Sequence, residues 1–283
     1  MEEKQGKIAG IGGLELSWQA WLPTEPQAVV LLVHGFGEHC RRYNNVVEHL
    51  VPAGFGVWGI DHRGHGKSQG RLGHVDSFSD YVEDLHKFYQ ELVAPAAGNL
   101  PRFVLGHSMG SIIAMNYVSM YSVGLAGCVL SGTGAASPLS ENKVVSAATA
   151  LLSTVAPKVR IKFPLPPEFI SRDPQVVAAY KADPLVHDKM SFRLGRGMST
   201  ALAAGVVAIQ GLDIPILIQC GSEDESFIRQ QELYDGLRSR DKTLKIYQGL
   251  KHEVYNELEA DRKGVLADLL TWLRHRGRVR LSQ

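Results

Sequence analysis

Short apolar runs alternate with helical patterns along most of the chain. The run Ala28–Val33 is unbroken and rich in β-branched residues, which is typical of a strand buried on both faces of a parallel sheet. Further runs of this kind follow at Phe55–Ile60, Phe103–Leu105, Gly127–Leu130, Ile214–Cys220 and Leu244–Tyr247. Between two of them, apolar residues recur at the spacing of one helix face, at Phe78, Tyr81, Leu85, Phe88 and Leu92. This order predicts an α/β fold, with a mostly parallel sheet flanked by helices.

The alternation of strands and helices is interrupted at the start of the chain and again in its middle. At the beginning, Lys7–Leu22 alternates loosely around Gly12-Gly13, which predicts an antiparallel hairpin. Between residues 133 and 199 the strand pattern lapses, and the segment is rich in proline. Since the sheet pattern resumes afterwards, we interpret 133–199 as a helical cap inserted into one core made of residues 1–132 and 200–283.

Composition and charge argue against a nucleic-acid-binding protein and against a membrane-spanning one. The net charge is +1 and 21% of residues are charged, so no global charge favours nucleic-acid binding. The start of the chain lacks the basic and apolar regions of a signal peptide, and no apolar run reaches the roughly 20 residues that span a bilayer. The three cysteines are widely separated and contain no Cys-x-x-Cys pair. We therefore expect a cytoplasmic protein, and no feature of the sequence indicates an oligomeric state.

The strongest chemical signal is Gly106-His107-Ser108-Met109-Gly110. It follows the expected strand Phe103–Leu105 and precedes an apolar helical stretch, so it stands in the context of a G-x-S-x-G nucleophile elbow. The turn would place the Ser108 hydroxyl at a helix amino terminus, where negative charge is favoured. The alternative is a capping serine in an ordinary turn, but the order of strand, elbow and helix favours Ser108 as a nucleophile.

A serine nucleophile needs a histidine base and an acid that orients it. In the order serine, acid, histidine, only His187, His252 and His275 follow Ser108. His187 falls in the insertion and His275 in a basic tail, whereas His252 follows the expected strand Leu244–Tyr247. His252 would therefore lie at the carboxyl edge of the sheet, where such sites are built.

The acid is expected after the strand Ile214–Cys220. Asp224 is favoured there, and its neighbour Glu223 is the main alternative. The oxyanion of the tetrahedral intermediate needs backbone donors, and the amides of Phe36 and Met109 occupy the expected positions.

Asp61–Ser68 is a loop rich in glycine and histidine, and it invites a metal interpretation. No His-Glu-x-x-His spacing is present, so we expect no metal there and interpret the loop as a support for the oxyanion loop. No phosphate-binding glycine loop of the Walker type occurs, and the sequence predicts no cofactor.

Together these motifs resemble the monoglyceride lipase and lysophospholipase branch of the α/β-hydrolases. The resemblance covers nearly the whole chain and is carried by His34–His39, Asp61–Ser68, Gly106–Gly110, Ser171–Pro174, Ala182–His187, Gly221–Asp224 and Gly249–Glu253. It implies a triad of Ser108, Asp224 and His252, and it implies that Glu38 and Arg42 hold a glycerol headgroup. The chain departs from the usual pattern at Ser111, where a glycine is common, and at Glu225–Ile228, where an apolar pair is common.

The insertion offers its own indication of a lipid. Val144–Ala156 is apolar except for hydroxyls, and Ser146, Thr149 and Ser153 form one polar stripe at helical spacing. Lys158–Phe163 then alternates basic and apolar residues, a pattern suited to anionic lipid headgroups. A cap helix that merely packs on the core explains the apolar segment equally well. We expect a lipid ester substrate and transient membrane contact through the cap.

The resulting hypothesis is a serine hydrolase that cleaves monoacylglycerols through an acyl-enzyme. A lysophospholipase or a broad short-chain carboxylesterase is the alternative within the same class. A non-catalytic hydrolase-like protein that binds a ligand is the alternative from another class.

Overall fold

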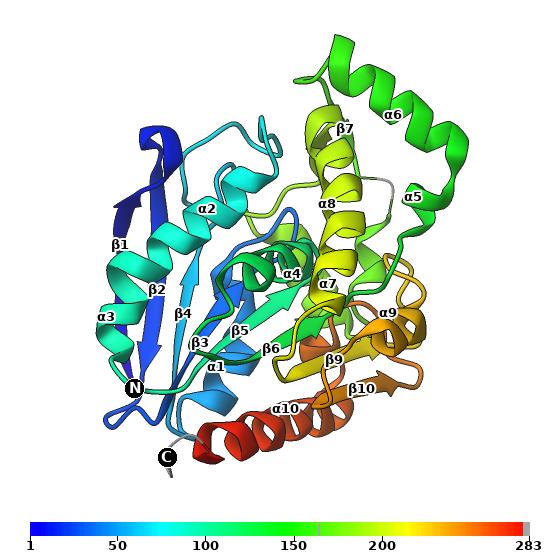
Figure 1. Ribbon diagram of the computed structural model, residues 1–283. Coiled ribbons are helices and arrows are strands. Elements are labelled where there is room, and N and C mark those ends of the chain that lie inside the picture. Colours follow the sequence, from blue (N-terminus) through cyan, green and yellow to red (C-terminus); the bar gives the residue numbers. More distant parts are fainter. Residues whose placement is uncertain (164, 280–283) are drawn as a thin grey trace.

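The computed structural model describes residues 1–163 and 165–279, and its centre is a sheet of eight strands in the order β1-β2-β4-β3-β5-β6-β9-β10 (Figure 1). Only β2 runs antiparallel to its two neighbours; all other adjacent strands are parallel. The strands are β1 (Glu2–Ala9), β2 (Glu15–Leu22), β3 (Ala28–Val33), β4 (Phe55–Ile60), β5 (Arg102–His107), β6 (Leu125–Ser131), β9 (Ile216–Gly221) and β10 (Lys242–Tyr247). The predicted α/β-hydrolase fold is confirmed.

The hairpin of β1 and β2 turns where the sequence predicts. Gly12 and Gly13 both have positive φ, 72° and 80°, which glycine adopts without a side-chain clash. The hairpin begins at Glu2, earlier than the expected Lys7. The sequence did not show this earlier start, because β1 is an edge strand whose first residues are exposed and carry no apolar pattern.

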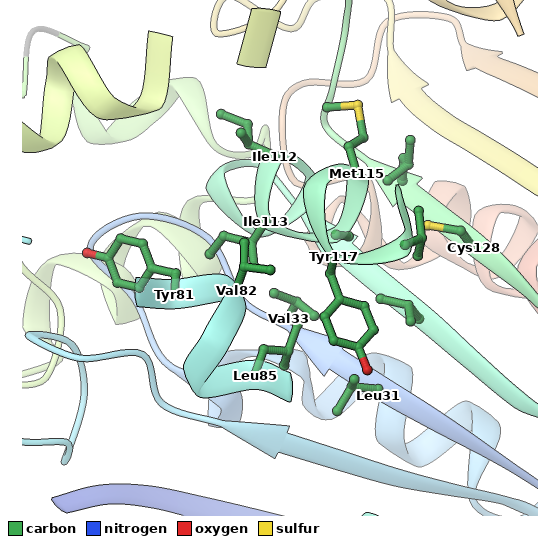
Figure 2. Close-up of a cluster of buried hydrophobic side chains, with 14 of the residues drawn as sticks. Leu31, Val33, Tyr81, Val82, Leu85, Ile112, Ile113, Met115, Tyr117 and Cys128 are labelled. Carbon is green, nitrogen blue, oxygen red and sulfur yellow. The ribbon is translucent and has the colours of Figure 1, made fainter. Parts of the chain in front are cut away.

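Helices cover both faces of the sheet and bury two apolar clusters. On one face, α2 (Ser79–Phe88) and α4 (Met109–Tyr121) pack on β3 and β5, with Tyr81, Leu85, Ile113 and Tyr117 between them (Figure 2). The other face is covered by α1 (Asn44–Leu50) and α10 (Glu259–Val279). None of the described helices is both long and apolar enough to cross a membrane.

The segment between β6 and β9 is built mainly from helices. These are α5 (Pro138–Glu141), α6 (Lys143–Val155), α7 (Pro174–Ala182) and α8 (Phe192–Gln210). The sequence showed no clear strand in this segment, but β7 (Arg160–Lys162) and β8 (Lys189–Ser191) pair there as a short antiparallel ribbon. The alternating residues of 158–163 therefore have the periodicity of a strand. α8 crosses residue 199, so the expected end of the insertion falls inside a helix.

α6 turns its apolar side away from the molecule. Val144, Leu151 and Val155 are 79%, 64% and 68% exposed. Of its hydroxyl stripe, Ser153 is buried, and Ser146 and Thr149 are half-buried and line the cavity described below. The helix extends away from the sheet in Figure 1 and packs against α8.

A second part of the insertion is fixed to the core, and we call residues 167–172 the docked segment. The Glu253 amide donates a hydrogen bond to the Ile170 carbonyl of this segment, at 2.8 Å. The Ser171 hydroxyl donates to the Asn256 carbonyl, also at 2.8 Å. The Arg172 guanidinium pairs with the buried carboxylate of Glu257 at 3.0 Å. The insertion thus has one arm on the surface and one against the loop that carries His252.

Candidate active site

Ser108 occupies a strained turn between β5 and α4. Its φ and ψ are 55° and −121°, a conformation that residues with a side chain rarely adopt. A Cβ on Gly106 would overlap the Gly110 carbonyl, and a Cβ on Gly110 would overlap the Val33 carbonyl. Because both positions lack side chains, β3, β5 and α4 approach closely enough to hold the turn. The Ser108 side chain lines a cavity at the carboxyl ends of the strands.

His252 and Asp224 meet as the sequence predicts. His252 Nδ1 lies 2.8 Å from Asp224 Oδ2, and both side chains are buried. Asp224 Oδ1 also accepts the Ser226 amide at 2.7 Å, which fixes the carboxylate. Burial by itself would lower the pKa of His252, but the adjacent Asp224 carboxylate outweighs it and raises that pKa above 6.5. Burial acts in the opposite sense on Asp224, and the His252 ring outweighs it to lower the pKa of the carboxyl.

The alternative candidates lie elsewhere. Glu223 is exposed beside Asp224, and His275 is exposed on α10. His187 packs its ring edge-on against Phe36, with ring centroids 5.3 Å apart, and its amide donates to the Gly37 carbonyl. His187 thus contacts the loop after β3 and not the acid. The structure brings Ser108 and His252 to one cavity, although among the described residues no hydrogen bond joins the two side chains. Catalytic hydrogen bonds are often longer without substrate.

The loop after β3 carries Phe36 at the cavity. Gly37 has a φ of 73°, which lets the chain turn sharply after Phe36. The Gly35 amide donates to Glu38 Oε1 at 2.6 Å, which folds the loop onto itself. Among the described residues, neither the Phe36 amide nor the Met109 amide donates to a protein acceptor, so both are free for a ligand oxygen.

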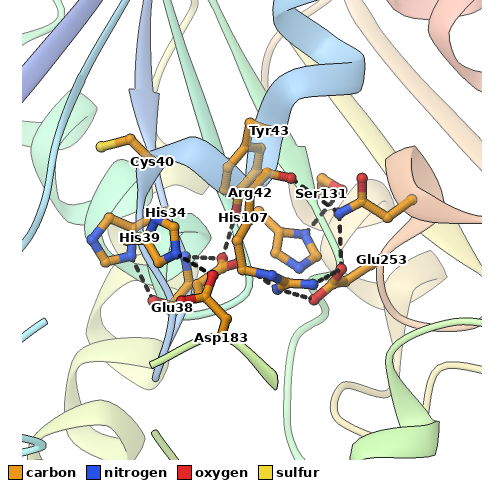
Figure 3. Close-up of polar contacts among 12 residues, drawn as sticks. His34, Glu38, His39, Cys40, Arg42, Tyr43, His107, Ser131, Asp183 and Glu253 are labelled. Carbon is orange, nitrogen blue, oxygen red and sulfur yellow. Dashed lines mark hydrogen bonds and ion pairs between the residues drawn. The ribbon is translucent and has the colours of Figure 1, made fainter. Parts of the chain in front are cut away.

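Glu38 and Arg42 belong to a buried network of polar contacts (Figure 3), and both also line the cavity. Glu38 accepts the Tyr43 hydroxyl and one Arg42 nitrogen, each at 2.7 Å. Arg42 also makes two bonds to Glu253, at 2.6 and 2.8 Å, and lies over the Tyr180 ring. Burial favours the neutral form of Glu38, but Arg42, the neighbouring histidines and the Tyr43 hydroxyl together outweigh burial and lower the pKa of this carboxyl to about 2.

Glu253 is the member of this network that sequence reasoning missed. It lies next to His252 in the sequence, and its carboxylate fixes Arg42, which is 211 residues away. The one available signal was its place within the His252 motif, since no local pattern links it to Arg42. The network ties the loop after β3 to the loop of His252 and so joins the expected oxyanion donor to the expected base.

The Asp61–Ser68 loop supports the loop after β3, as predicted. Asp61 accepts the Cys40 amide at 3.0 Å, and the His62 amide donates to His34 Nε2 at 2.9 Å. The His34 and His62 rings lie 4.2 Å apart, and burial lowers the pKa of both. In the described part of the chain no three potential ligands are grouped to hold a metal ion.

The cavity at Ser108 has a volume of about 400 Å³ and a mostly apolar wall. Its polar lining residues include Ser108, Glu38 and Arg42, and the insertion and α8 add several hydroxyl and basic side chains. The apolar wall comes largely from the insertion and α8, through Leu139, Val145, Ile161, Phe163, Phe169, Ile170, Met190, Phe192, Met198 and Leu202. Such a site suits a molecule with a small polar end and a long apolar part.

Known proteins share both this sequence and this architecture. The chain is 38% identical to a monoacylglycerol lipase of Mycolicibacterium smegmatis, over 94% of this chain and 95% of that protein. It is 31% identical to the monoglyceride lipase of Rattus norvegicus, over 95% of this chain and 90% of the relative.

Solved structures and a family model agree with these relatives. A soluble variant of the monoglyceride lipase from Saccharomyces cerevisiae, solved with a substrate analogue, superposes with a TM-score of 0.85 at 27% identity, covering 96% of this chain and 94% of that one. The family model described as serine aminopeptidase, S33, matches residues 24–259. The chain therefore belongs to this hydrolase family, in the monoglyceride lipase and lysophospholipase branch of the α/β-hydrolases.

Proposed function

We propose that the chain hydrolyses monoacylglycerols to a fatty acid and glycerol, with Ser108, Asp224 and His252 as the catalytic triad. The observation that carries this proposal is the buried His252–Asp224 pair, which shares one cavity with the elbow serine. His252 Nε2 takes the proton of Ser108 as Oγ attacks the ester carbonyl. Asp224 accepts the hydrogen on Nδ1 and so keeps Nε2 free to act as the base.

The acyl-enzyme forms and breaks in two balanced steps. In the first, the C–O bond to glycerol breaks and the proton on His252 passes to the glycerol oxygen. In the second, His252 takes a proton from water as the water oxygen attacks the acyl carbon; the bond from that carbon to Ser108 Oγ then breaks, the fatty acid leaves, and His252 returns the proton to Oγ. The free amides of Phe36 and Met109 are the proposed donors to the oxyanion in both steps.

The mostly apolar wall of the cavity supports binding of an acyl chain, and its polar residues near Ser108 support binding of a small headgroup. Each methylene buried against the apolar wall contributes about 0.8 kcal/mol, so chain length should affect affinity. Glu38 and Arg42 are the proposed partners of the glycerol hydroxyls. Their mutual ion pair occupies some of their hydrogen-bonding capacity, and unused guanidinium N–H groups and carboxylate lone pairs remain at the cavity.

The decisive experiment compares substrates with and without the nucleophile. The wild type should release glycerol from a monoacylglycerol faster than it hydrolyses lysophosphatidylcholine or a short nitrophenyl ester. Ser108→Ala should lower the rate by a factor on the order of 10⁶ while the thermal unfolding midpoint stays near that of the wild type. Glycerol release by Ser108→Ala at the wild-type rate would contradict the mechanism. A faster rate on lysophosphatidylcholine would contradict the substrate.

The cap role of residues 133–199 is part of this proposal, and so is membrane contact. The exposed apolar side of α6 continues into a basic surface hollow. Its cations are Arg71, Lys158, Arg160 and Lys189. An apolar face beside a group of cations suits the interface of an anionic membrane. These features support transient contact with a membrane, from which the chain would take its substrate, and we propose the cytoplasm as its location from the sequence.

A further inference from the structure

Two phenylalanine rings lie beside the ring of His252. Phe227 follows the acid loop of the core, and its ring is nearly parallel to the imidazole, at 16°, with centroids 6.1 Å apart. Phe169 belongs to the docked segment, and its centroid is closer, at 5.3 Å and 35°. Both side chains line the cavity that holds Ser108. The expected base is therefore in contact with an aromatic ring supplied by the insertion.

The backbone around Phe169 is fixed to the loop that carries His252. The Lys251 ammonium donates to the Glu168 carbonyl at 2.7 Å. The His252 amide contacts the Phe169 carbonyl at 3.5 Å, and the next amide, of Glu253, donates to Ile170. Three successive residues of one segment thus meet three successive residues of the other. These contacts fix the backbone on both sides of Phe169, so the ring leaves His252 only if its own rotamer changes or the pairing opens.

The groups around His252 determine how well its charged form is stabilised. Asp224 pairs with Nδ1, and the carboxylates of Glu253 and Glu38 act on the ring from further away. His107 lies 4.7 Å from His252, and burial together with the repulsion of His252 lowers its pKa to about 4. His107 is thus neutral when the enzyme works near neutral pH. A cation within about 6 Å of a phenylalanine centroid is attracted to the ring face, and Phe169 meets that limit.

We propose that Phe169 is a positioning residue for the reaction: its ring holds the His252 imidazole against Asp224 and stabilises the imidazolium that forms when Ser108 loses its proton. This inference rests on the triad proposed above. Its consequence is that the catalytic base is assembled jointly by the core and the insertion. A chain with an intact core and a displaced docked segment would keep its nucleophile and lose part of its base.

The test measures the rate at which a fluorophosphonate probe labels Ser108 between pH 5 and 9, together with kcat and KM on a soluble ester. Because Asp224 raises the pKa of His252 above 6.5, labelling by the wild type should increase with pH and reach half its maximum above 6.5. Phe169→Leu removes the ring, so the charged imidazole loses its attraction to the ring. We expect kcat and the maximal labelling rate to fall about 2- to 30-fold and the midpoint to shift to lower pH.

Two further variants separate a role in positioning from a role in packing. Phe169→Tyr keeps the aromatic face and should restore most of the rate and the wild-type midpoint. Phe163→Leu is the matched control, since Phe163 lines the same cavity and lies 6.0 Å from Phe169, while its other ring contact is Phe36. Phe163→Leu should change KM and leave the midpoint in place.

The possible failures are distinguishable. A Phe169→Leu variant with the wild-type midpoint and labelling rate would overturn the inference and leave the triad intact. A wild type that does not label at Ser108 would instead overturn the proposed function. Circular dichroism checks the fold of each variant. Phe169→Met, which keeps apolar volume without an aromatic face, replaces the leucine variant if that one unfolds.

Discussion

The two arms of the insertion differ in what they contact. α6 presents Val144, Leu151 and Val155 to the outside, whereas the docked segment is tied by hydrogen bonds and an ion pair to the loop of His252. Both arms also contribute side chains to the cavity wall. One insertion can therefore serve two purposes, because its surface arm can change its environment while its docked arm keeps a fixed relation to the base. We expect the largest effect at the base that the docked segment contacts, and smaller effects from changes to the two arms themselves.

The largest effect is expected at the acid that orients His252. Asp224→Asn keeps the shape of the side chain but no longer favours the hydrogen on Nδ1, so kcat on a monoacylglycerol should fall roughly 10⁴-fold. Glu223→Gln is the control, because Glu223 is exposed beside Asp224, and its rate should stay within a few-fold of the wild type. A larger loss of kcat in the Glu223 variant than in the Asp224 variant would show that Glu223, and not Asp224, is the acid.

A smaller effect is expected from charging the surface arm. The double variant Val144→Glu, Leu151→Glu should weaken binding to vesicles of phosphatidylglycerol and phosphatidylcholine by roughly 10- to 100-fold, since two apolar side chains leave the interface and two negative charges enter it. Neither residue lines the cavity, so turnover of a soluble nitrophenyl ester should not change. Binding is measured by co-sedimentation.

Val123→Glu provides the comparison for that experiment. Val123 is 96% exposed and lies between α4 and β6, at the opposite ends of the strands from the cavity. Its substitution should leave vesicle binding unchanged. Equal losses in both variants would show that added charge, and not the position on α6, governs binding.

The smallest effect is expected on the free energy of unfolding, when the ion pair that holds the docked segment is removed. Arg172→Met leaves the buried Glu257 carboxylate with its backbone donors but without the guanidinium, so the free energy of unfolding in urea should fall by roughly 1–2 kcal/mol. Lys181→Met removes an ion pair with Glu168 in which both side chains are about half exposed, and its effect on the free energy of unfolding should be much smaller than that of Arg172→Met. If both variants lose the same free energy of unfolding, the Arg172–Glu257 pair stabilises the chain no more than an ordinary surface ion pair.

Features carried by local patterns were predictable from the sequence. The buried strands show as β-branched runs, and the elbow needs its glycines and serine in one pentapeptide. The His252–Asp224 contact followed from topology, because the carboxyl ends of β9 and β10 lie at one edge of the sheet. The apolar segment of α6 was visible as well, but its exposure was not, since an apolar face gives the same sequence pattern whether it is covered or open.

Contacts between distant segments were not predictable. Arg42 and Glu253 meet across 211 residues, and Phe169 reaches His252 from another part of the chain. Neither contact leaves a periodic signal, because each depends on the path of a loop. The unusual charge at Glu225 proved compatible with the acid loop, since Glu225 is exposed and the Ser226 amide still binds Asp224.

The close approach at Gly110 has a consequence for inherited variation in this chain. Any side chain there would push α4 away from β3, and β3 leads directly into the loop that carries Phe36. A single substitution would then displace Ser108 and a proposed oxyanion donor together, so selection would act on both at once. The three atoms nearest to such a side chain belong to Val33 and His34 and to none of the described residues of the insertion, so changes in the cavity wall that the insertion supplies can accumulate without this joint loss.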